Sequence, residues 1–532
     1  MLNSIRATGG MAVAPHALAA QSAVAVLRER GNALEAMIAA AATIPVVYPH
    51  MNSIGGDGFW LIHVPGQPVR AIDACGAAAL AASRDWYAAR GFSKAIPFRG
   101  GVAANTVAGT ISGWDLAFAL SHELGGRLPL ARLLADAVDY AEHGIAVTAS
   151  QAVNTAAKRS DLGPQPGFAQ AFLPGGDAPE TGQIFRQPRL AATLRHLAAK
   201  GLDDFYRGEL ARAIAADLAR AGSPLTLADL ERHHAQWRTP LRFEHSLGTL
   251  YNLPPPTQGL VSLLILGILD ALDIAKVDPA SADYVHLCVE ATKRAFRIRD
   301  HHITDPAYMT VDPQSFLAPA AVRELAAAID RHKAAPWGAG KGPADTIWMG
   351  VIDAEGRAVS FIQSLYHEFG SGVVLQETGI NWQNRGCSFS LDAAALNALE
   401  PGRKPFHTLN PALAVLADGR VMVYGNMGGD GQPQSQSAVF TRSVVYGWGP
   451  QAAISAPRWL LGRTWGQATE TLKLESRFPP EVMGELRARG HDVEVIGAFD
   501  ESVGHAGAIL RHANGVLEGG ADPRSDGSVA AL

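Results

Sequence analysis

Cysteine is scarce in this chain. The three cysteines, Cys75, Cys288 and Cys387, are far apart among 532 residues, and no two form a Cys-x-x-Cys pair. An odd, dispersed set of this kind is not typical of the disulfide framework of a secreted protein. We therefore expect free thiols in a reducing compartment, and a cytoplasmic protein.

Long apolar runs and blocks of like charge are also missing. The longest apolar stretch, residues 259–275, is interrupted by Asp270, and the N-terminal residues lack the apolar core of a secretory signal. That stretch is too short to span a bilayer. A formal net charge of −5 without a basic cluster gives no electrostatic footprint for nucleic acid or an anionic membrane. The expected partner is a small molecule.

Several common catalytic patterns are absent as well. The sequence has no Gly-x-Ser-x-Gly elbow, no Gly-Lys-Ser/Thr after a glycine-rich run and no His-Glu-x-x-His. Adjacent histidines occur at 233–234 and 301–302, but neighbouring side chains diverge in a strand or a helix. We expect neither a metal nor a cofactor.

Helical and strand patterns divide the chain unevenly. With 48% hydrophobic residues, it can bury a large core. Apolar spacing predicts two helices within 14–45, separated at Arg30–Asn32, and further helices within 115–142, 189–222, 257–274 and 281–300. Residues 160–187, rich in Pro and Gly, are expected to form a loop. After Gly342 short strand-like runs appear, including 373–375, 412–417 and 421–424. The fold class is α+β.

One hairpin places two hydroxyl side chains together. Residues 346–353 and 357–364 are strand-prone, and the loop between them offers Gly356 for a left-handed position. Pairing Asp353 with Arg357 puts Thr346 opposite Ser364. Taken alone, both hydroxyls are ordinary strand residues.

A series of segments, which follow one another in a fixed order along the chain, bears on the role of Thr346. They are residues 9–16, 31–33, 48–59, 345–346, 369–374, 379–380, 409–411, 428–429 and 522–524. Over nearly its whole length the chain resembles the γ-glutamyltransferase family of N-terminal nucleophile hydrolases. The resemblance implies a four-layer αββα fold, made as a precursor that cuts itself between Asp345 and Thr346. The large fragment 1–345 and the small fragment 346–532 would remain associated as a heterodimer, and such heterodimers can pair in turn.

The resemblance also implies the catalytic set. Thr346 is the expected nucleophile, with Ser364 beside it. Cleavage frees the α-amine of Thr346, whose ordinary pKa of about 8 suits a general base. Gly428 and Gly429 match the glycine pair whose N–H groups form the oxyanion hole. By itself the run Gly-Gly-Asp-Gly is weak evidence, because it also occurs at Gly55–Gly58 and most such runs are turns.

Departures from the family pattern concern the substrate. Cys75 stands where members that bind γ-glutamyl groups have an arginine for the α-carboxylate, and Ser388 stands where they have an acid for the α-amine. Arg385 replaces a usual glutamine and could hold a carboxylate through two hydrogen bonds. Asn384, His407 and Thr408 are further candidates for the substrate pocket.

Residues 379–391 and 401–411 look most like the oxamate amidohydrolase branch of the family. That resemblance implies hydrolysis of oxamate to oxalate and ammonia, at the end of a purine-degradation route. Alternatives remain open: a γ-glutamyl hydrolase or transferase acting on glutathione-like substrates, and an uncleaved, non-catalytic binding protein. Arg385 could instead be tied in a salt bridge, and His407 could be a core histidine.

Overall fold

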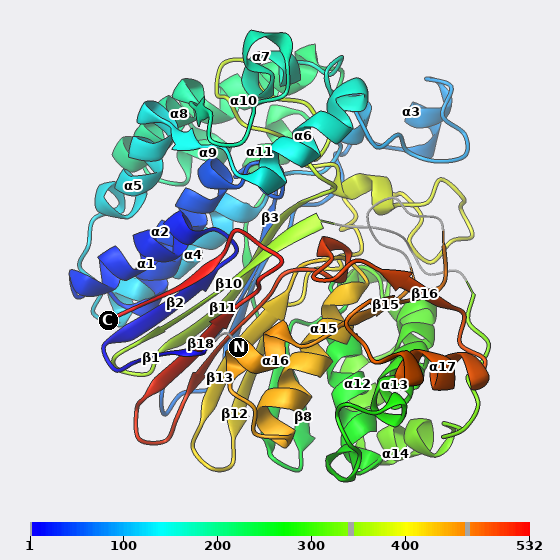
Figure 1. Ribbon diagram of the computed structural model, residues 1–532. Helices are drawn as coiled ribbons and strands as arrows, with labels where there is room; N and C mark the ends of the chain where they lie inside the picture. Colours follow the sequence, from blue (N-terminus) through cyan, green and yellow to red (C-terminus); the bar gives the residue numbers. More distant parts are fainter. Residues whose placement is uncertain (1–2, 339–344, 463–468) are drawn as a thin grey trace.

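Two stacked, seven-stranded antiparallel sheets form the centre of the molecule in a computed structural model, which describes residues 3–338, 345–462 and 469–532 (Figure 1). The first sheet has the order β19 (Ser528–Ala531), β2 (Gly10–Ala14), β10 (Asp345–Asp353), β11 (Ala358–Tyr366), β3 (Asp57–His63), β4 (Arg70–Ala74) and β7 (Gln236–Arg238). The second has the order β1 (Ile5–Ala7), β18 (Leu517–Ala521), β17 (Ala506–Arg511), β13 (Val421–Asn426), β12 (Ala412–Leu416), β9 (Gly248–Asn252) and β8 (Leu241–His245).

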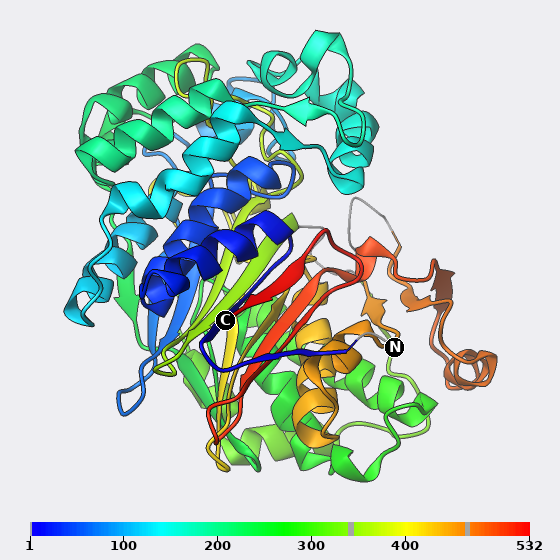
Figure 2. The same ribbon diagram turned by 60° about the vertical axis from the view of Figure 1, so that its left-hand side comes forward.

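Helices cover both outer faces of this pair of sheets. Against the first sheet pack α1 (Ala17–Arg28), α2 (Ala33–Val47) and α4 (Thr110–Glu123), with α5 (Leu130–His143) and α8 (Pro188–Lys200) behind them. The second sheet is covered by α12 (Gly259–Ala271), α15 (Gly431–Phe440) and α16 (Pro450–Ser455), and α13 (Ala282–His302) packs against α12 and α15. Figure 2 shows the sheets between the two helical layers. This is the four-layer αββα sandwich that the resemblance implied.

Smaller elements complete the fold. They are α3 (Arg84–Ala88), α6 (Ala149–Leu162), α7 (Phe168–Phe172), α9 (Asp204–Arg207), α10 (Glu209–Arg220), α11 (Leu227–Glu231), α14 (Pro319–Ala327), α17 (Pro480–Ala488), β5 (Ile145–Ala146), β6 (Ile184–Phe185), β14 (Trp459–Leu461), β15 (Leu472–Glu475) and β16 (Val493–Ile496). The strands β14, β15 and β16 make a separate small sheet beside α17.

The apolar core has three layers because each sheet is buried on both faces. The middle layer, between the sheets, contains Phe59, Trp348, Leu413 and Ile509. The outer layers join each sheet to its helices. Strand β11 is buried along its whole length. Because both of its faces are covered, its sequence lacks the simple apolar–polar alternation of a half-exposed strand.

The first two helices follow the sequence closely. Arg30 adopts a left-handed conformation, with φ of 66°, and ends α1. Asn32 then begins α2 with a capping box, in which the Glu35 side chain accepts from the Asn32 N–H. The break predicted at Arg30–Asn32 is confirmed.

The hairpin has the predicted register. Ile347 pairs with Gln363, and the pairing continues to Ile352 and Ala358. Gly356, with φ of 81°, takes the left-handed position in the turn. The strand pairing changes register between Asp345 and Ile347, so the regular ladder is interrupted where β10 begins.

Two local predictions were wrong. The segment 160–187 contains the helix α7, because Phe168 and Phe172 pack against Phe369. Residues 373–375 form no strand but a single bridge between Val374 and Asn381. The three cysteines are free, as expected. None of the described helices is long and apolar enough to cross a membrane.

Candidate active site

Thr346 lies near the start of β10 and is fully buried. Its Oγ1 is 3.3 Å from the Ser364 Oγ on β11 and 3.4 Å from the Gln432 Nε2 on α15. The Ser364 Oγ also accepts from the Tyr366 N–H at 2.8 Å. The structure therefore brings the two predicted hydroxyls together, and it adds Gln432, which the sequence did not single out.

A third polar residue extends this row across the first sheet. Asp57 on β3 pairs directly with Ser364 on β11, and paired residues in adjacent strands project to the same face. One carboxylate oxygen of Asp57 accepts from the N–H groups of Gly76 and Gly109, both at 3.0 Å. The other oxygen lies 3.5 Å from the His407 Nε2.

Burial controls the protonation of this pair. It raises the pKa of Asp57 to about 7, although the two N–H donors and the nearby Arg385 charge oppose the rise. Burial also lowers the pKa of His407 well below its usual value. The imidazole is thus neutral near pH 7, and the 3.5 Å contact with Asp57 is not an ion pair.

The glycine pair lies in the loop between β13 and α15. Gly428 and Gly429 have φ values of 109° and 52°, a region that favours glycine. Within the described residues, neither of their N–H groups donates to a protein acceptor. The loop leads within four residues to Gln432, which contacts Thr346. The structure thus places the pair in the same neighbourhood as the threonine, and the oxyanion role stays a prediction.

Gln258 braces this loop from the side of α12. Its Nε2 donates to the carbonyl oxygens of Thr408 and Gly429, each at 2.8 Å. Its Oε1 accepts from the Arg299 guanidinium at 3.1 Å, and Arg299 pairs with Asp430 at 2.7 Å. One buried amide therefore fixes the glycine loop and the predicted pocket residue Thr408 relative to each other. No motif in the sequence marks Gln258 or Arg299.

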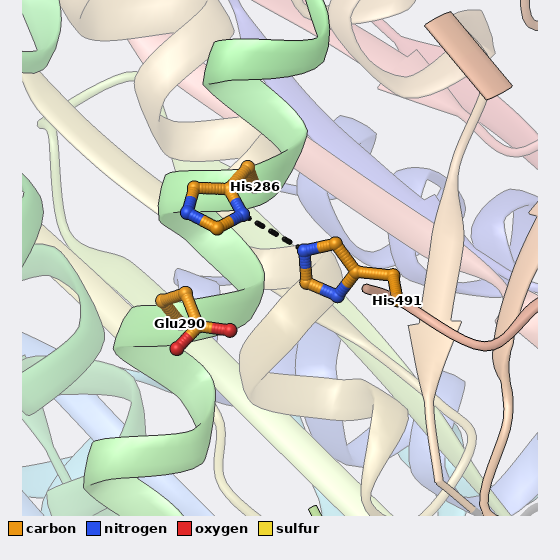
Figure 3. A group of neighbouring side chains, drawn as sticks. All are labelled: His286, Glu290 and His491. Carbon is orange, nitrogen blue, oxygen red and sulfur yellow. Dashed lines mark hydrogen bonds between the residues drawn. The ribbon is translucent and has the colours of Figure 1, made fainter. Parts of the chain in front are cut away.

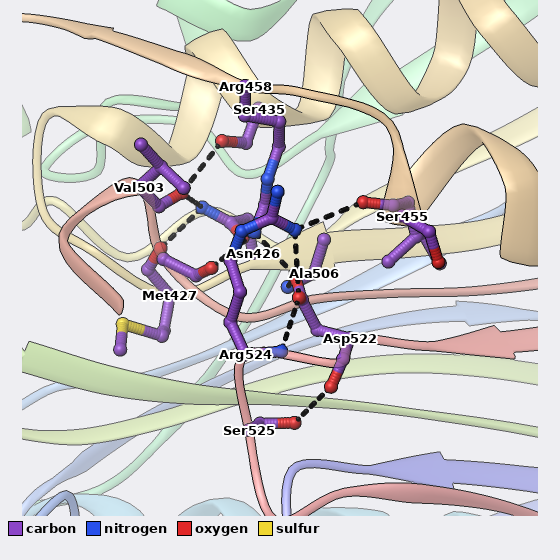
Figure 4. Close-up of polar contacts among 12 residues, drawn as sticks. Asn426, Met427, Ser435, Ser455, Arg458, Val503, Ala506, Asp522, Arg524 and Ser525 are labelled. Carbon is purple, nitrogen blue, oxygen red and sulfur yellow. Dashed lines mark hydrogen bonds and ion pairs between the residues drawn. The ribbon is translucent and has the colours of Figure 1, made fainter. Parts of the chain in front are cut away.

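A buried ionic cluster contacts Asn426, next to this loop (Figure 4). Arg458 donates to the Asn426 Oδ1 at 3.1 Å and to Asp522 at 2.5 Å. Arg524 pairs with Asp522 at 3.0 Å and with Glu475 at 2.6 Å. Asn426 in turn donates to the carbonyl oxygen of Met427, directly before the glycine pair. The segment 522–524 thus has a supporting role.

Arg385 is buried, and its guanidinium has no hydrogen-bond partner among the described residues. Its side chain lies in the short helix Arg385–Ser388, is 1% exposed, and stacks with its guanidinium carbon 4.0 Å from the centre of the Tyr366 ring. None of its three nitrogens makes a hydrogen bond to a described residue, and no described carboxylate lies within salt-bridge distance. Burial lowers its pKa. Within the described chain, Arg385 therefore forms no structural salt bridge.

The other predicted pocket residues differ in how available they are. Both ring nitrogens of His407 and the Thr408 Oγ1 are buried without a hydrogen-bond partner in the described ranges. The His407 ring also packs edge-on against Phe59, with ring centres 5.0 Å apart. The Asn384 amide, in contrast, is occupied: it donates to the Phe98 carbonyl at 2.8 Å and accepts from the His367 N–H at 3.2 Å.

A cavity of about 370 Å³ lies beside Thr408. Its lining includes Phe98, Tyr366, Cys387, Ser388, Phe406 and Thr408. The Ser388 hydroxyl faces the Phe406 carbonyl at 3.4 Å. Cys75 is buried on another side, where its N–H donates to Asp73, which is paired with Lys404 at 2.8 Å. The lysine near Cys75 is thus already engaged by an acid.

The sequence missed Asp57 for a specific reason. It belongs to the run Gly55–Gly58, a pattern that is typical of turns, whereas in the structure Asp57 begins β3. Its position directly after a glycine pair and before an apolar run was the available signal. Buried carboxylates next to buried polar groups are characteristic of functional sites.

Comparisons with known proteins identify the family of this chain. The family model described as "Gamma-glutamyltranspeptidase" matches residues 19–532. The oxamate amidohydrolase proenzyme of Klebsiella pneumoniae is 61% identical over 532 residues, covering 100% of both chains. The glutathione hydrolase proenzyme of Escherichia coli is 30% identical, covering 99% of this chain and 92% of its own.

A solved structure agrees with these sequence matches. The cephalosporin acylase from Bacillus halodurans superimposes with a TM-score of 0.91 at 33% identity, covering 100% of this chain and 97% of its own. The similarity therefore includes both sheets and both helical layers. The chain belongs to the gamma-glutamyltranspeptidase family.

Proposed function

We propose that this protein is a self-cleaving amidohydrolase that hydrolyses a small carboxylate-bearing amide, with oxamate as its substrate, through an acyl-enzyme on Thr346. The observation that carries the proposal is the buried guanidinium of Arg385, which makes no hydrogen bond to any residue that the structure describes. An isolated buried charge is costly, and a substrate carboxylate would compensate it with two charge-assisted hydrogen bonds. The 61% identical relative named for oxamate supports the same choice.

Self-cleavage comes first in this scheme. The Thr346 Oγ1 attacks the Asp345 carbonyl carbon, and the peptide C–N bond breaks as the nitrogen becomes the free α-amine of Thr346. Water then hydrolyses the ester, which leaves fragments 1–345 and 346–532. Because β10 lies between β2 and β11 in the first sheet, the fragments are expected to stay together as a heterodimer.

Turnover uses the same oxygen. The α-amine takes the proton of the Thr346 Oγ1, which attacks the amide carbon of the substrate. The N–H groups of Gly428 and Gly429 stabilise the developing oxyanion. The nitrogen leaves as ammonia with that proton, and water hydrolyses the oxalyl ester to oxalate. Ser364 and Gln432 hold the Oγ1 in position.

The remaining pocket residues fit a small substrate. His407 is neutral, and the Thr408 hydroxyl has no hydrogen-bond partner within the described chain, so both offer hydrogen bonds without adding charge. Cys75 and Ser388 provide no charged anchor for a γ-glutamyl group. The purine-degradation setting and a cytoplasmic location remain predictions that accompany the choice of oxamate.

Ammonia release from oxamate and from glutamine, measured side by side, tests the proposal. Thr346→Ala serves as the blank, and denaturing mass spectrometry reports whether the chain is cleaved. Release from oxamate alone supports the assignment. Release from glutamine alone would contradict the reading of Arg385, Cys75 and Ser388. A single intact chain that is inactive on both would favour a non-catalytic homologue.

A further inference from the structure

Two histidines and a glutamate converge in the helical layer over the second sheet, apart from the candidate active site (Figure 3). His286 and Glu290 lie one turn apart on α13, and His491 follows α17. One possible ligand atom from each side chain can be chosen so that all three lie within 4.8 Å of one another. All three residues are buried.

The His286 ring is already oriented as a metal ligand would be. Its Nε2 lies 2.8 Å from the Asp330 carbonyl oxygen. A carbonyl can only accept, so the Nε2 carries the proton. The Nδ1 lone pair therefore points at the His491 Nε2, 2.8 Å away. A ligating histidine commonly donates its other N–H to a backbone carbonyl in this way.

His491 needs only a change of tautomer to complete the pair. In the hydrogen-bonded form its Nε2 donates a proton to His286. Its Nδ1 has no hydrogen-bond partner in the described part of the chain, so the proton can move to that nitrogen. Each ring then carries one proton and presents one nitrogen lone pair. Neutral imidazole is the form that binds a metal.

Glu290 offers the third ligand atom. Its Oε1 accepts from the Lys293 ammonium at 2.7 Å and from the Ala335 N–H at 3.2 Å. Among the described residues, its Oε2 accepts only from the Ala335 N–H, also at 3.2 Å. One carboxylate oxygen thus keeps a lone pair. The Lys293 charge weakens the attraction for a cation, and we expect a moderate affinity.

We propose that His286, Glu290 and His491 form a binding site for a divalent transition-metal ion of the zinc type, with water as a fourth ligand. Two imidazoles and a carboxylate are a ligand set that such ions favour. Binding breaks the His286–His491 hydrogen bond and moves one proton within His491, so no net proton is released. Two ligands precede Thr346 and one follows it. If the chain is cleaved there, the ion would link the two fragments.

Metal titration tests this site directly. The full-length protein is stripped with a chelator, dialysed and titrated with Zn²⁺ by calorimetry, and Co²⁺ is added separately to record its visible absorption. We expect one equivalent to bind at micromolar concentration, with a Co²⁺ spectrum of nitrogen and oxygen ligation. His286→Gln and His491→Gln should each weaken binding at least 100-fold.

Two further variants test whether the effect is specific to the proposed site. His301→Gln changes an exposed histidine on the same helix and should leave binding unchanged. Lys293→Met removes the competing cation and should tighten binding. Circular dichroism checks that each variant is folded; should His286→Gln not fold, the more peripheral His491→Gln decides. Zn²⁺ binding that is absent, or equal in wild type and His491→Gln, would overturn the proposal.

Discussion

Replacing Arg385 with methionine should damage catalysis and stabilise the protein at the same time. Methionine keeps an unbranched apolar side chain against the Tyr366 ring and removes a buried charge that makes no hydrogen bond to a described residue. Two charge-assisted hydrogen bonds to a substrate carboxylate are worth about 1.5–3 kcal/mol each. Their loss should lower kcat/KM for oxamate by roughly 10²–10⁴-fold.

The stability effect has the opposite sign. Removing a desolvated cation that has no hydrogen-bond partner in the described ranges should raise the free energy of unfolding by about 1–3 kcal/mol. Arg458→Met is the matched control, because Arg458 is equally buried but paired with Asp522. Leaving that carboxylate without this partner should destabilise the protein by about 3–5 kcal/mol.

Three measurements on each variant separate these effects. Ammonia release gives kcat and KM, denaturing electrophoresis shows whether both fragments form, and urea unfolding gives stability. Arg385→Met should cleave normally, since its role is to anchor the substrate. A variant that hydrolyses oxamate at the wild-type rate, or that is less stable than wild type, would refute the reasoning.

Three other predictions concern residues around the nucleophile. Thr346→Ala should yield one intact chain and no ammonia, whereas Thr346→Ser should keep cleavage; an active, cleaved Thr346→Ala would exclude Thr346 as nucleophile. Gln258→Leu removes the amide that joins Thr408 to Gly429. Losing about 1–3 kcal/mol of transition-state stabilisation should lower kcat about 10–100-fold, with little change in KM. Replacing the exposed Gln170 in Gln170→Leu is the control, and equal kcat values in the two variants would refute the bracing role of Gln258. Asp57, with its pKa raised to about 7, should repel a substrate carboxylate when ionised, so KM should rise above about pH 7, and Asp57→Asn should abolish that rise. The folded protein holds this proton more tightly than the unfolded chain, so the Asp57 contribution should also make stability fall between about pH 4 and pH 7; a wild-type KM that is flat across pH 7 would contradict the assignment.

Local sequence determined the elements in which the decisive interactions are short-range. The hairpin register followed from one three-residue turn, because fixing a turn fixes every pair beyond it. The break between α1 and α2 followed from Arg30–Asn32, where capping chemistry is local. The family resemblance supplied Thr346 and the glycine pair, which composition alone would have left as a strand residue and a turn.

Tertiary structure decided which polar groups meet and which remain without a partner. Asp57 and His407 are 350 positions apart, and His286 and His491 are 205 apart, so no local pattern could pair them. Phe168 and Phe172 became helical because Phe369 covers them. Whether Arg385 formed a salt bridge depended on every chain segment packed around it. The sequence specifies side-chain chemistry and local backbone preference, whereas burial and the compensation of charge arise only when distant segments pack together.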